Sequence, residues 1–221
     1  GVVKMKTKPK FTQVFSNTAA INWLSAARFF LFGSRDVWFV VGLPVFLYSV
    51  HGWSFTQVGG FIALWVIGYG IVQANAPRLI RRSHHGKGPG GSTARLWAFI
   101  LALFPAVMAL ALQSGLAPAL ILVTGLVLFG GVFAINSAVH SYLILAYSDF
   151  DKVSMNVGFY YMANAGGRLA GTILSGLVYQ TQGLAGCLWW SAAFVLAAAV
   201  LSFKLPDVEP QAESGKQAAQ V

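Results

Sequence analysis

The amino-acid sequence predicts an all-α membrane protein, built as a bundle of six transmembrane helices. Of its 221 residues, 57% are hydrophobic and only 10% are charged, a composition too apolar for an ordinary soluble domain. The apolar residues form long continuous runs, whereas the strands of a transmembrane β-barrel alternate apolar and polar residues. Helices, and not strands, are therefore expected to cross the membrane.

Each of the apolar runs is long enough to cross about 30 Å of hydrocarbon at about 1.5 Å per helical residue. They cover residues 21–50, 55–77, 95–114, 117–146, 153–179 and 183–204. The first run is long for one crossing, so we expect it to tilt or to project beyond the bilayer. Three regions follow: a cytoplasmic N-terminal segment (1–20), a transmembrane domain (21–205) with one long cytoplasmic loop (78–94), and a polar, disordered cytoplasmic tail (206–221).

The basic residues predict the orientation of the bundle. Connections that retain Lys and Arg stay on the cytoplasmic side during insertion. The turns 49–54, 113–118 and 180–184 carry neither residue, whereas the alternate flanks carry Lys4, Lys6, Lys8, Lys10, Arg78, Arg81, Arg82, Lys87, Arg95, Lys152, Lys204 and Lys216. We therefore expect a multi-pass protein of the cell inner (plasma) membrane with both termini in the cytoplasm. This topology explains the net charge of +9 without nucleic-acid binding.

Several other functions are disfavoured by the sequence. The first residues lack the apolar core of a signal peptide, and the absence of an initial Met leads us to expect a piece of a longer chain. The only cysteine, Cys187, is expected to be a packing residue. The stretch 81–95 contains Gly, Lys and two adjacent histidines, but it lacks phosphate-loop spacing and further metal ligands. It is interpreted as a linker near anionic lipid, and no cofactor or metal is expected.

Apart from the flanking residues, four charged residues lie inside the predicted spans: Arg28, Arg35, Asp36 and Arg168. A charge at the centre of a transmembrane helix costs about 2.5–3.5 kcal/mol, so such residues usually face a bundle interior or an aqueous pathway. Arg28 and Arg35 are seven residues apart and share a helix face. Because three arginines meet one acid, positive charge is left over at depth, and guanidinium groups bind oxyanions through paired hydrogen bonds.

Polar and aromatic stripes accompany these charges. One stripe follows the fifth run at spacings of three and four, Asn156, Tyr160, Asn164, Arg168, Gly171 and Ser175. In the fourth run Asn136 and His140 are four residues apart, and in the second run Trp65, Tyr69 and Gln73 repeat every four residues. We expect the stripes to converge on one cavity. The candidate substrate-binding residues are Arg28, Arg35, Arg168, Asn164, Tyr160, Asn136 and His140.

Each candidate also has a purely structural interpretation. Asp36 is a candidate proton-coupling residue, but it could instead form a buried ion pair with Arg168 or with an arginine of its own helix, locking the helices together. Arg28 could extend its guanidinium to the membrane interface. Asn136 and His140 could be packing residues with satisfied hydrogen bonds.

Three stretches resemble a known family. They are NWLSAARFFLFGSRDVWFVVGLPVFLY (22–48), GGFIALWVIGYGIVQANAP (59–77) and NAGGRLAGTILSGLVYQTQGLAGCLWWSA (164–192). Together with the spans and basic flanks, they resemble the C-terminal half of a major facilitator superfamily transporter, and in particular the organoarsenical efflux permease of arsenic-resistance operons. The resemblance implies a twelve-helix transporter whose N-terminal half is missing here, with a solute bound between the halves. It also implies export of an arsenylated phosphoglycerate.

The expected function is therefore secondary active transport, with this chain as one half of a carrier that exports a small organic anion by alternating access. A major facilitator transporter of another small solute, a channel and a structural membrane subunit are the alternatives. An enzyme is not expected. An intramembrane serine protease needs a reactive serine paired with a histidine, and His140 has no matching serine motif.

Overall fold

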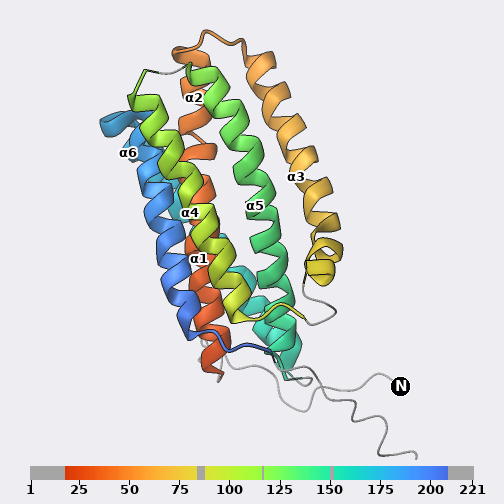
Figure 1. Ribbon diagram of the computed structural model, residues 1–221. Helices are drawn as coiled ribbons and strands as arrows, with labels where there is room; N and C mark the ends of the chain where they lie inside the picture. Colours follow the sequence, from red (N-terminus) through yellow and green to blue (C-terminus); the bar gives the residue numbers. More distant parts are fainter. Residues whose placement is uncertain (1–17, 84–87, 116, 150–151, 209–221) are drawn as a thin grey trace, which may run out of the picture.

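Helices form all the regular structure in the part of the chain that the computed structural model describes, residues 18–83, 88–115, 117–149 and 152–208 (Figure 1). In chain order they are α1 (Ala19–Phe39), α2 (Gly42–Ser49), α3 (Phe55–Ser83), α4 (Gly91–Gln113), α5 (Pro118–Ala146) and α6 (Val153–Leu201), followed by the short 3-10 helix η2 (Ser202–Lys204). The predicted N-terminal segment, the middle of the predicted loop and most of the predicted tail lie outside the described residues.

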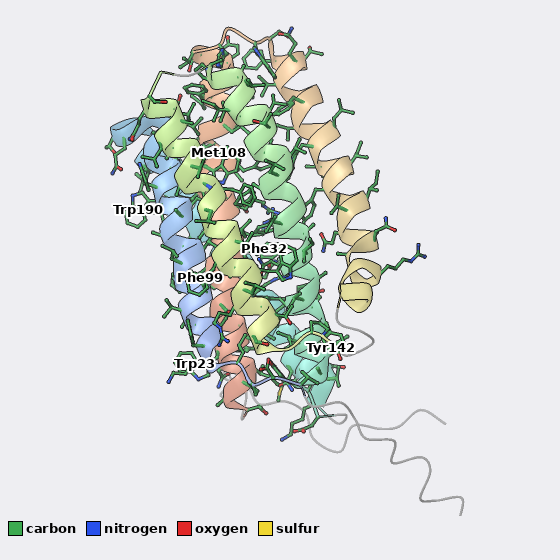
Figure 2. The ribbon with its side chains drawn as sticks, in the orientation of Figure 1. Trp23, Phe32, Phe99, Met108, Tyr142 and Trp190 are labelled. Atoms are coloured by element: carbon green, nitrogen blue, oxygen red, sulfur yellow. The ribbon has the colours of Figure 1, made fainter. Side chains whose placement is uncertain are left out.

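Five of these helical stretches are long and apolar enough to cross a membrane: Ala19–Ser49, Phe55–Ala76, Gly91–Gln113, Pro118–Ala146 and Val153–Lys204. Their outer surfaces are apolar as well. Trp23 and Trp190 stand on the outside of the bundle, whereas Phe32 lies between the helices (Figure 2). Exposed apolar side chains occur on each long helix, for example Leu64, Leu103, Val127, Leu169 and Val200. A surface of this kind is suited to lipid. The class predicted from composition, a helical membrane protein, is confirmed at this level.

The helix α6 contains a reversal. Gly183 has φ 66° and ψ −167°, a backbone conformation that is accessible essentially to glycine alone. The Sγ of Cys187 lies 3.7 Å from the carbonyl oxygen of Ser175, although a straight helix would separate residues twelve apart by about 18 Å. The two arms of α6, 153–182 and 184–201, therefore lie side by side. The two apolar runs predicted here, 153–179 and 183–204, are thus two helical arms joined by a glycine turn.

The chain runs back and forth along the length of the bundle (Figure 1). The connections 50–54 and 114–117 lie at one end, and the ends of α3 and α5 lie at the other with the start of α4. The side of the membrane on which each end lies stays a prediction.

The first predicted span, 21–50, is broken between α1 and α2. Pro44 has no N–H to donate to the carbonyl of Val40, and its ring clashes with that carbonyl in a continuous helix. At this break the N–H groups of Val41 and Gly42 donate to the Oγ of Ser175, at 3.3 and 3.0 Å. Ser175 in the polar stripe of α6 therefore supplies an acceptor for backbone N–H groups at the break between α1 and α2.

The first arm of α6 packs directly on the backbone of α1. A Cβ atom added to Gly171 would lie 2.6 Å from the carbonyl oxygen of Gly33, and one added to Gly167 would overlap the carbonyl oxygen of Phe29. This is the close approach that small residues four apart permit between transmembrane helices. The backbones of α1 and α6 therefore touch at the level of the intramembrane charges.

The helix α3 packs along α5 at the edge of the bundle (Figure 1). The indole Nε1 of Trp65 donates to the carbonyl oxygen of Leu126 at 2.9 Å, and the same ring lies against Gly130. Only 6% of the most apolar window of α3 is buried inside the protein. Most of α3 therefore faces away from the other described helices.

A polar clasp at one end of the bundle consists of Gly91, Ser92, Tyr147, Pro206 and Asp207. The Oδ1 of Asp207 accepts the N–H of Ser92 at 2.8 Å and its hydroxyl at 2.7 Å, which caps the start of α4, where Gly90 offers no side chain. The carbonyl of Pro206 accepts the N–H of Gly91 and the hydroxyl of Tyr147. Residues 206 and 207, predicted to begin a disordered tail, are thus bound to α4 and α5.

The contact between α1 and α6 gives a matched pair of substitutions. We expect Gly167→Ala to destabilise the protein by at least about 1–3 kcal/mol, because the new methyl group displaces one backbone from the other. Gly176→Ala, on the same arm, adds its methyl group to open space and is expected to leave stability unchanged or slightly raised. Thermal unfolding of both variants in detergent measures the difference, and equal midpoints would contradict the backbone contact.

The clasp predicts a pH dependence of stability. Hydrogen bonds from Ser92 lower the pKa of Asp207 below its ordinary value of 3.8. The capping contribution is therefore complete above that value and is lost as the pH falls through the lower folded-state pKa. Asp207→Ala is expected to remove about 1 kcal/mol at pH 7 and little at strongly acidic pH. Unfolding of both proteins across this range tests the capping role, and a constant difference in stability would refute it.

Candidate functional site

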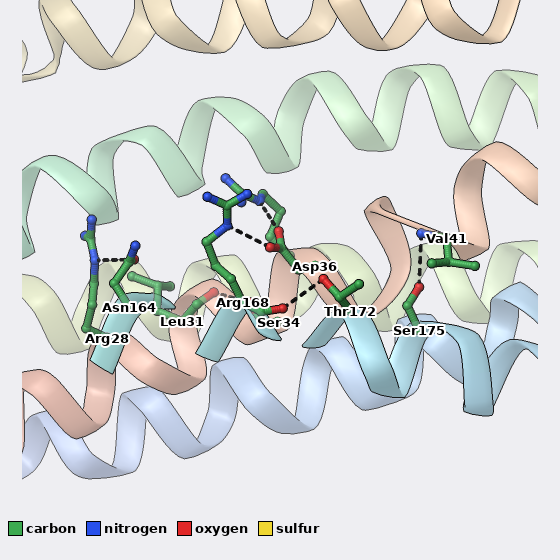
Figure 3. Close-up of polar contacts among 10 residues, drawn as sticks. Arg28, Leu31, Ser34, Asp36, Val41, Asn164, Arg168, Thr172 and Ser175 are labelled. Atoms are coloured by element: carbon green, nitrogen blue, oxygen red, sulfur yellow. Dashed lines mark hydrogen bonds and ion pairs between the residues drawn. The ribbon is translucent and has the colours of Figure 1, made fainter. Parts of the chain in front are cut away.

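Two cationic centres lie along the contact between α1 and the first arm of α6. We call one the Asp36 centre (Arg35, Asp36 and Arg168) and the other the Arg28 centre (Arg28, Ser137, Asn164 and Tyr160). Figure 3 shows Arg28 and Arg168 projecting from α1 and α6 toward the same side, where α5 lies. The sequence placed Arg28 and Arg35 on one helix face and Arg168 on the stripe of the fifth run. In the structure Arg35 and Arg168 share Asp36 as a partner, whereas Arg28 contacts Ser137 and Asn164.

In the Asp36 centre one carboxylate contacts two arginines. Its Oδ1 lies 2.6 Å from the Nε of Arg35, and its Oδ2 lies 2.9 Å from the Nε of Arg168. The side chain of Asp36 is 1% exposed, that of Arg35 12% and that of Arg168 55%. The buried ion pair considered from the sequence is therefore present, with both candidate partners at once. One carboxylate against two guanidinium groups leaves the centre with a net charge of +1.

The terminal nitrogens of these two arginines remain available. Each guanidinium donates to Asp36 through Nε, and no other hydrogen bond joins Arg35 or Arg168 side chains to the described part of the protein. A guanidinium has five N–H donors, so four remain on each side chain. Arg168 also presents more than half of its side chain at the protein surface. The centre can therefore accept an oxyanion without first losing its internal ion pairs.

In the Arg28 centre the cation is held by neutral groups. Nε donates to the Oδ1 of Asn164 at 3.1 Å, and Nη1 donates to the carbonyl and hydroxyl oxygens of Ser137 at 3.3 and 3.2 Å. Arg28 is 4% exposed, so its guanidinium lies among the helices and does not reach the interface. Within the described ranges no carboxylate lies within ion-pair distance of Arg28. Its contacts join α1, α5 and α6.

The ring of Phe32 lies next to both cationic centres. The Cζ of Arg28 is 3.8 Å from the ring centroid of Phe32, and the Cζ of Arg35 is 5.3 Å from it. Arg28 also lies over the ring of Tyr160, and Arg35 over the ring of Phe133. Cation–π attraction of this kind stabilises a guanidinium where water is excluded. Aromatic rings thus brace Arg28 and Arg35, whereas no such contact holds Arg168 among the described residues.

Asn136 and His140 are buried and make no hydrogen bond to either centre, and Tyr160 contacts Arg28 through its ring but not through its hydroxyl. Asn136 Nδ2 and Oδ1, His140 Nδ1 and the Tyr160 hydroxyl have no hydrogen-bond partner in the described part of the chain. An unsatisfied buried polar group costs about 1–3 kcal/mol, so water or a solute is a natural partner. The interpretation of Asn136 and His140 as packing residues with satisfied hydrogen bonds receives no support from their contacts.

Sequence reasoning missed Ser137 and the bridging ring of Phe32. Ser137 accepts hydrogen bonds from Arg28 and, through its Oγ, from Gln73 of α3 at 3.4 Å. The stripe Trp65, Tyr69, Gln73 faces α5 as its spacing predicts, with the first two rings stacked. Ser137 follows the predicted Asn136 directly, but a serine in an apolar helix is common and carries little signal by itself.

The described residues contain no group of three or more His, Cys, Asp and Glu side chains that could hold a metal ion. Comparison with known proteins adds no identification, because no family model matches the chain and no curated protein matches it. The class that the structure defines is a helical membrane protein with charged groups buried between its helices.

The Arg28 centre predicts the effect of removing one acceptor. We expect Asn164→Leu to destabilise the protein by about 1–3 kcal/mol, because the Nε of a buried cation loses its partner. Ala165→Leu, at the neighbouring exposed position, is the control and is expected to have little effect. The unfolding midpoint in detergent distinguishes them, and a stable Asn164→Leu variant would show that Arg28 does not depend on this bond.

Proposed function

We propose that the chain is one half of a secondary active transporter that carries a small organic anion across the membrane by alternating access. The observation that supports it best is the Asp36 centre, which has a net charge of +1, free guanidinium donors and an exposed Arg168. These features favour a binding site for an oxyanion. They give no reason to expect chemical conversion of the solute.

The position of Arg168 in its helix supports an aqueous path. Arg168 lies near the middle of the first arm of α6, and Arg35 and Asp36 lie near the middle of the span Ala19–Ser49. A charge at such depth costs about 2.5–3.5 kcal/mol or more when it faces acyl chains. Water, a charged solute or another protein domain reduces that cost. The exposed guanidinium therefore favours a solute path on this face of the bundle.

The arrangement of the helices favours a twelve-helix transporter. In this proposal the two arms of α6 cross the membrane separately, giving six crossings, and both termini lie in the cytoplasm. An N-terminal half of six helices covers the face that carries Arg168 and α3. The glycines of α3 have open space where a Cβ would lie, which suits close packing by helices outside the described chain: Gly59, Gly60, Gly68 and Gly70.

The proposed solute follows from the charge of the site and from the family resemblance. Guanidinium groups bind carboxylate, phosphate and arsenate-like oxyanions through paired hydrogen bonds. The organoarsenical permease that the sequence resembles suggests an arsenylated phosphoglycerate. We propose that Arg35 and Arg168 hold its oxyanion between the two halves, and that rocking of the halves exposes it to each side in turn.

Removal of the Arg168 charge tests the proposal. The complete protein is placed in inside-out vesicles. Arsenate, glyceraldehyde 3-phosphate, NAD and a dehydrogenase in the external solution then form the arsenylated phosphoglycerate. We expect the wild type to accumulate arsenic inside the vesicles. The rate of accumulation by Arg168→Gln is expected to be about 10- to 100-fold lower, because a hydrogen bond to a charged group contributes about 1.5–3 kcal/mol. Arg78→Gln, which removes an exposed charge of α3 outside both centres, is the control.

The outcome separates the parts of the proposal. Equal membrane levels of all three proteins show that insertion is intact. Wild-type rates in Arg168→Gln would contradict the role of Arg168. A wild type that accumulates neither arsenic nor radiolabelled 3-phosphoglycerate would contradict transport of a small organic anion.

A further inference from the structure

We propose that Asp36 is a positioning residue that joins Arg35 and Arg168 into one anion-binding clamp. This inference rests on the proposed function, and it assigns Asp36 a role different from the predicted proton coupling. The carboxylate touches both arginines, through Oδ1 and Oδ2 respectively, and it therefore fixes the position of one guanidinium relative to the other.

The atoms involved leave the binding edges free. Asp36 accepts only the Nε–H group of each arginine, and the Nη groups have no protein partner among the described residues. An arginine that used both Nη groups for an internal carboxylate would have its terminal edge occupied. Here the internal bonds occupy the stem side of each guanidinium. The terminal edges remain available to a second oxyanion.

Asp36 is held more rigidly than the arginines it contacts. Its side chain is 1% exposed, and a Cβ added to Gly171 would lie 3.1 Å from its Cβ, so the α6 backbone packs directly against it. The backbones of α1 and α6 touch at Gly33 and Gly171. The carboxylate therefore cannot move far unless these helices separate, and it provides a fixed point for both arginines.

The two arginines differ in what else holds them. Arg35 lies over the rings of Phe32 and Phe133, but the only side-chain partner of Arg168 among the described residues is Asp36. Arg168 is also the most exposed member of the centre. Without Asp36, binding of an anion has to immobilise a long, free side chain, and a site that is not preorganised binds more weakly.

Other roles of Asp36 predict different results. If Asp36 competed with the solute for the arginines, its removal would tighten binding. If it only locked α1 to α6, its removal would change stability but not affinity. If it carried the coupled proton, its removal would abolish accumulation driven by a pH gradient and leave affinity unchanged.

Equilibrium binding of radiolabelled 3-phosphoglycerate to the purified complete protein, with both halves, in nanodiscs distinguishes these roles. This stable anion is the probe for the whole series. We expect Asp36→Asn to raise Kd about tenfold, because Arg168 is no longer preorganised. Asp36→Glu keeps the charge but displaces the carboxylate, and we expect a smaller rise in Kd. Asp149→Asn removes an exposed acid outside the centre and is expected to bind like the wild type.

Counterflow of the same probe adds a readout that a purely structural role does not change. We expect Asp36→Asn to raise KM with little change in the maximal rate. A thermal midpoint measured for each variant shows whether it is folded. If Asp36→Asn does not fold, the Kd of Asp36→Glu is the test, because this variant keeps the negative charge that compensates the arginines. A folded variant whose Kd is unchanged or lower would overturn the clamp.

Failure of the clamp differs from failure of the proposed function. Binding by the wild type, loss of binding in Arg168→Gln and unchanged Kd in both Asp36 variants would overturn the clamp alone. Unchanged Kd together with loss of accumulation driven by a pH gradient would restore the proton-coupling role and also overturn the clamp. Absence of probe binding to the wild type would overturn both the anion site and the clamp.

Discussion

The structure depends on the direct contact between the backbones of α1 and the first arm of α6. Glycines at 33, 167 and 171 remove the side chains that would separate the helices, and the added Cβ atoms have no room. Only at this separation can the short side chain of Asp36 on α1 reach Arg168 on α6 at 2.9 Å. Buried charges are strongly destabilising without partners. The ion pairs therefore depend on the glycine packing. The close approach of the helices places Asp36 beside the arginines, and these pairs reduce the cost of burying the charges.

This contact also determines how the polar groups are divided. Ser175 accepts the N–H groups of Val41 and Gly42 at the break after α1, Arg168 contacts Asp36, and Asn164 contacts Arg28. One stripe of α6 therefore supplies polar partners at three levels along the first span. The ring of Phe32 lies near both arginines of α1 and so contacts both cationic centres. A helix that supplies polar partners at several levels holds its neighbour in a single register.

Much of this arrangement is encoded in patterns that a single sequence displays. The length of the apolar runs predicts the helices, and spacings of three and four place Arg168 and Asn164 on one face. Periodicity does not specify rotamers, so it could not show that Asp36 contacts two arginines or that Ser137 receives Arg28. The break at Pro44 has a recognisable cause, but length alone suggested a tilted helix. The clasp at Asp207 was hidden because a polar composition resembles disorder.

The arginines differ in exposure, and this difference indicates what kind of surface surrounds them. Arg28 is 4% exposed, and hydrogen bonds and aromatic rings compensate its charge inside the bundle. Arg168 has one ion pair and remains 55% exposed, so the described helices compensate its charge only in part. Hydrocarbon offers no partner for a guanidinium, whereas water, an anion or a polar protein surface does. The face of α6 that carries Arg168 is therefore suited to a polar boundary, although apolar side chains cover much of the rest of the bundle.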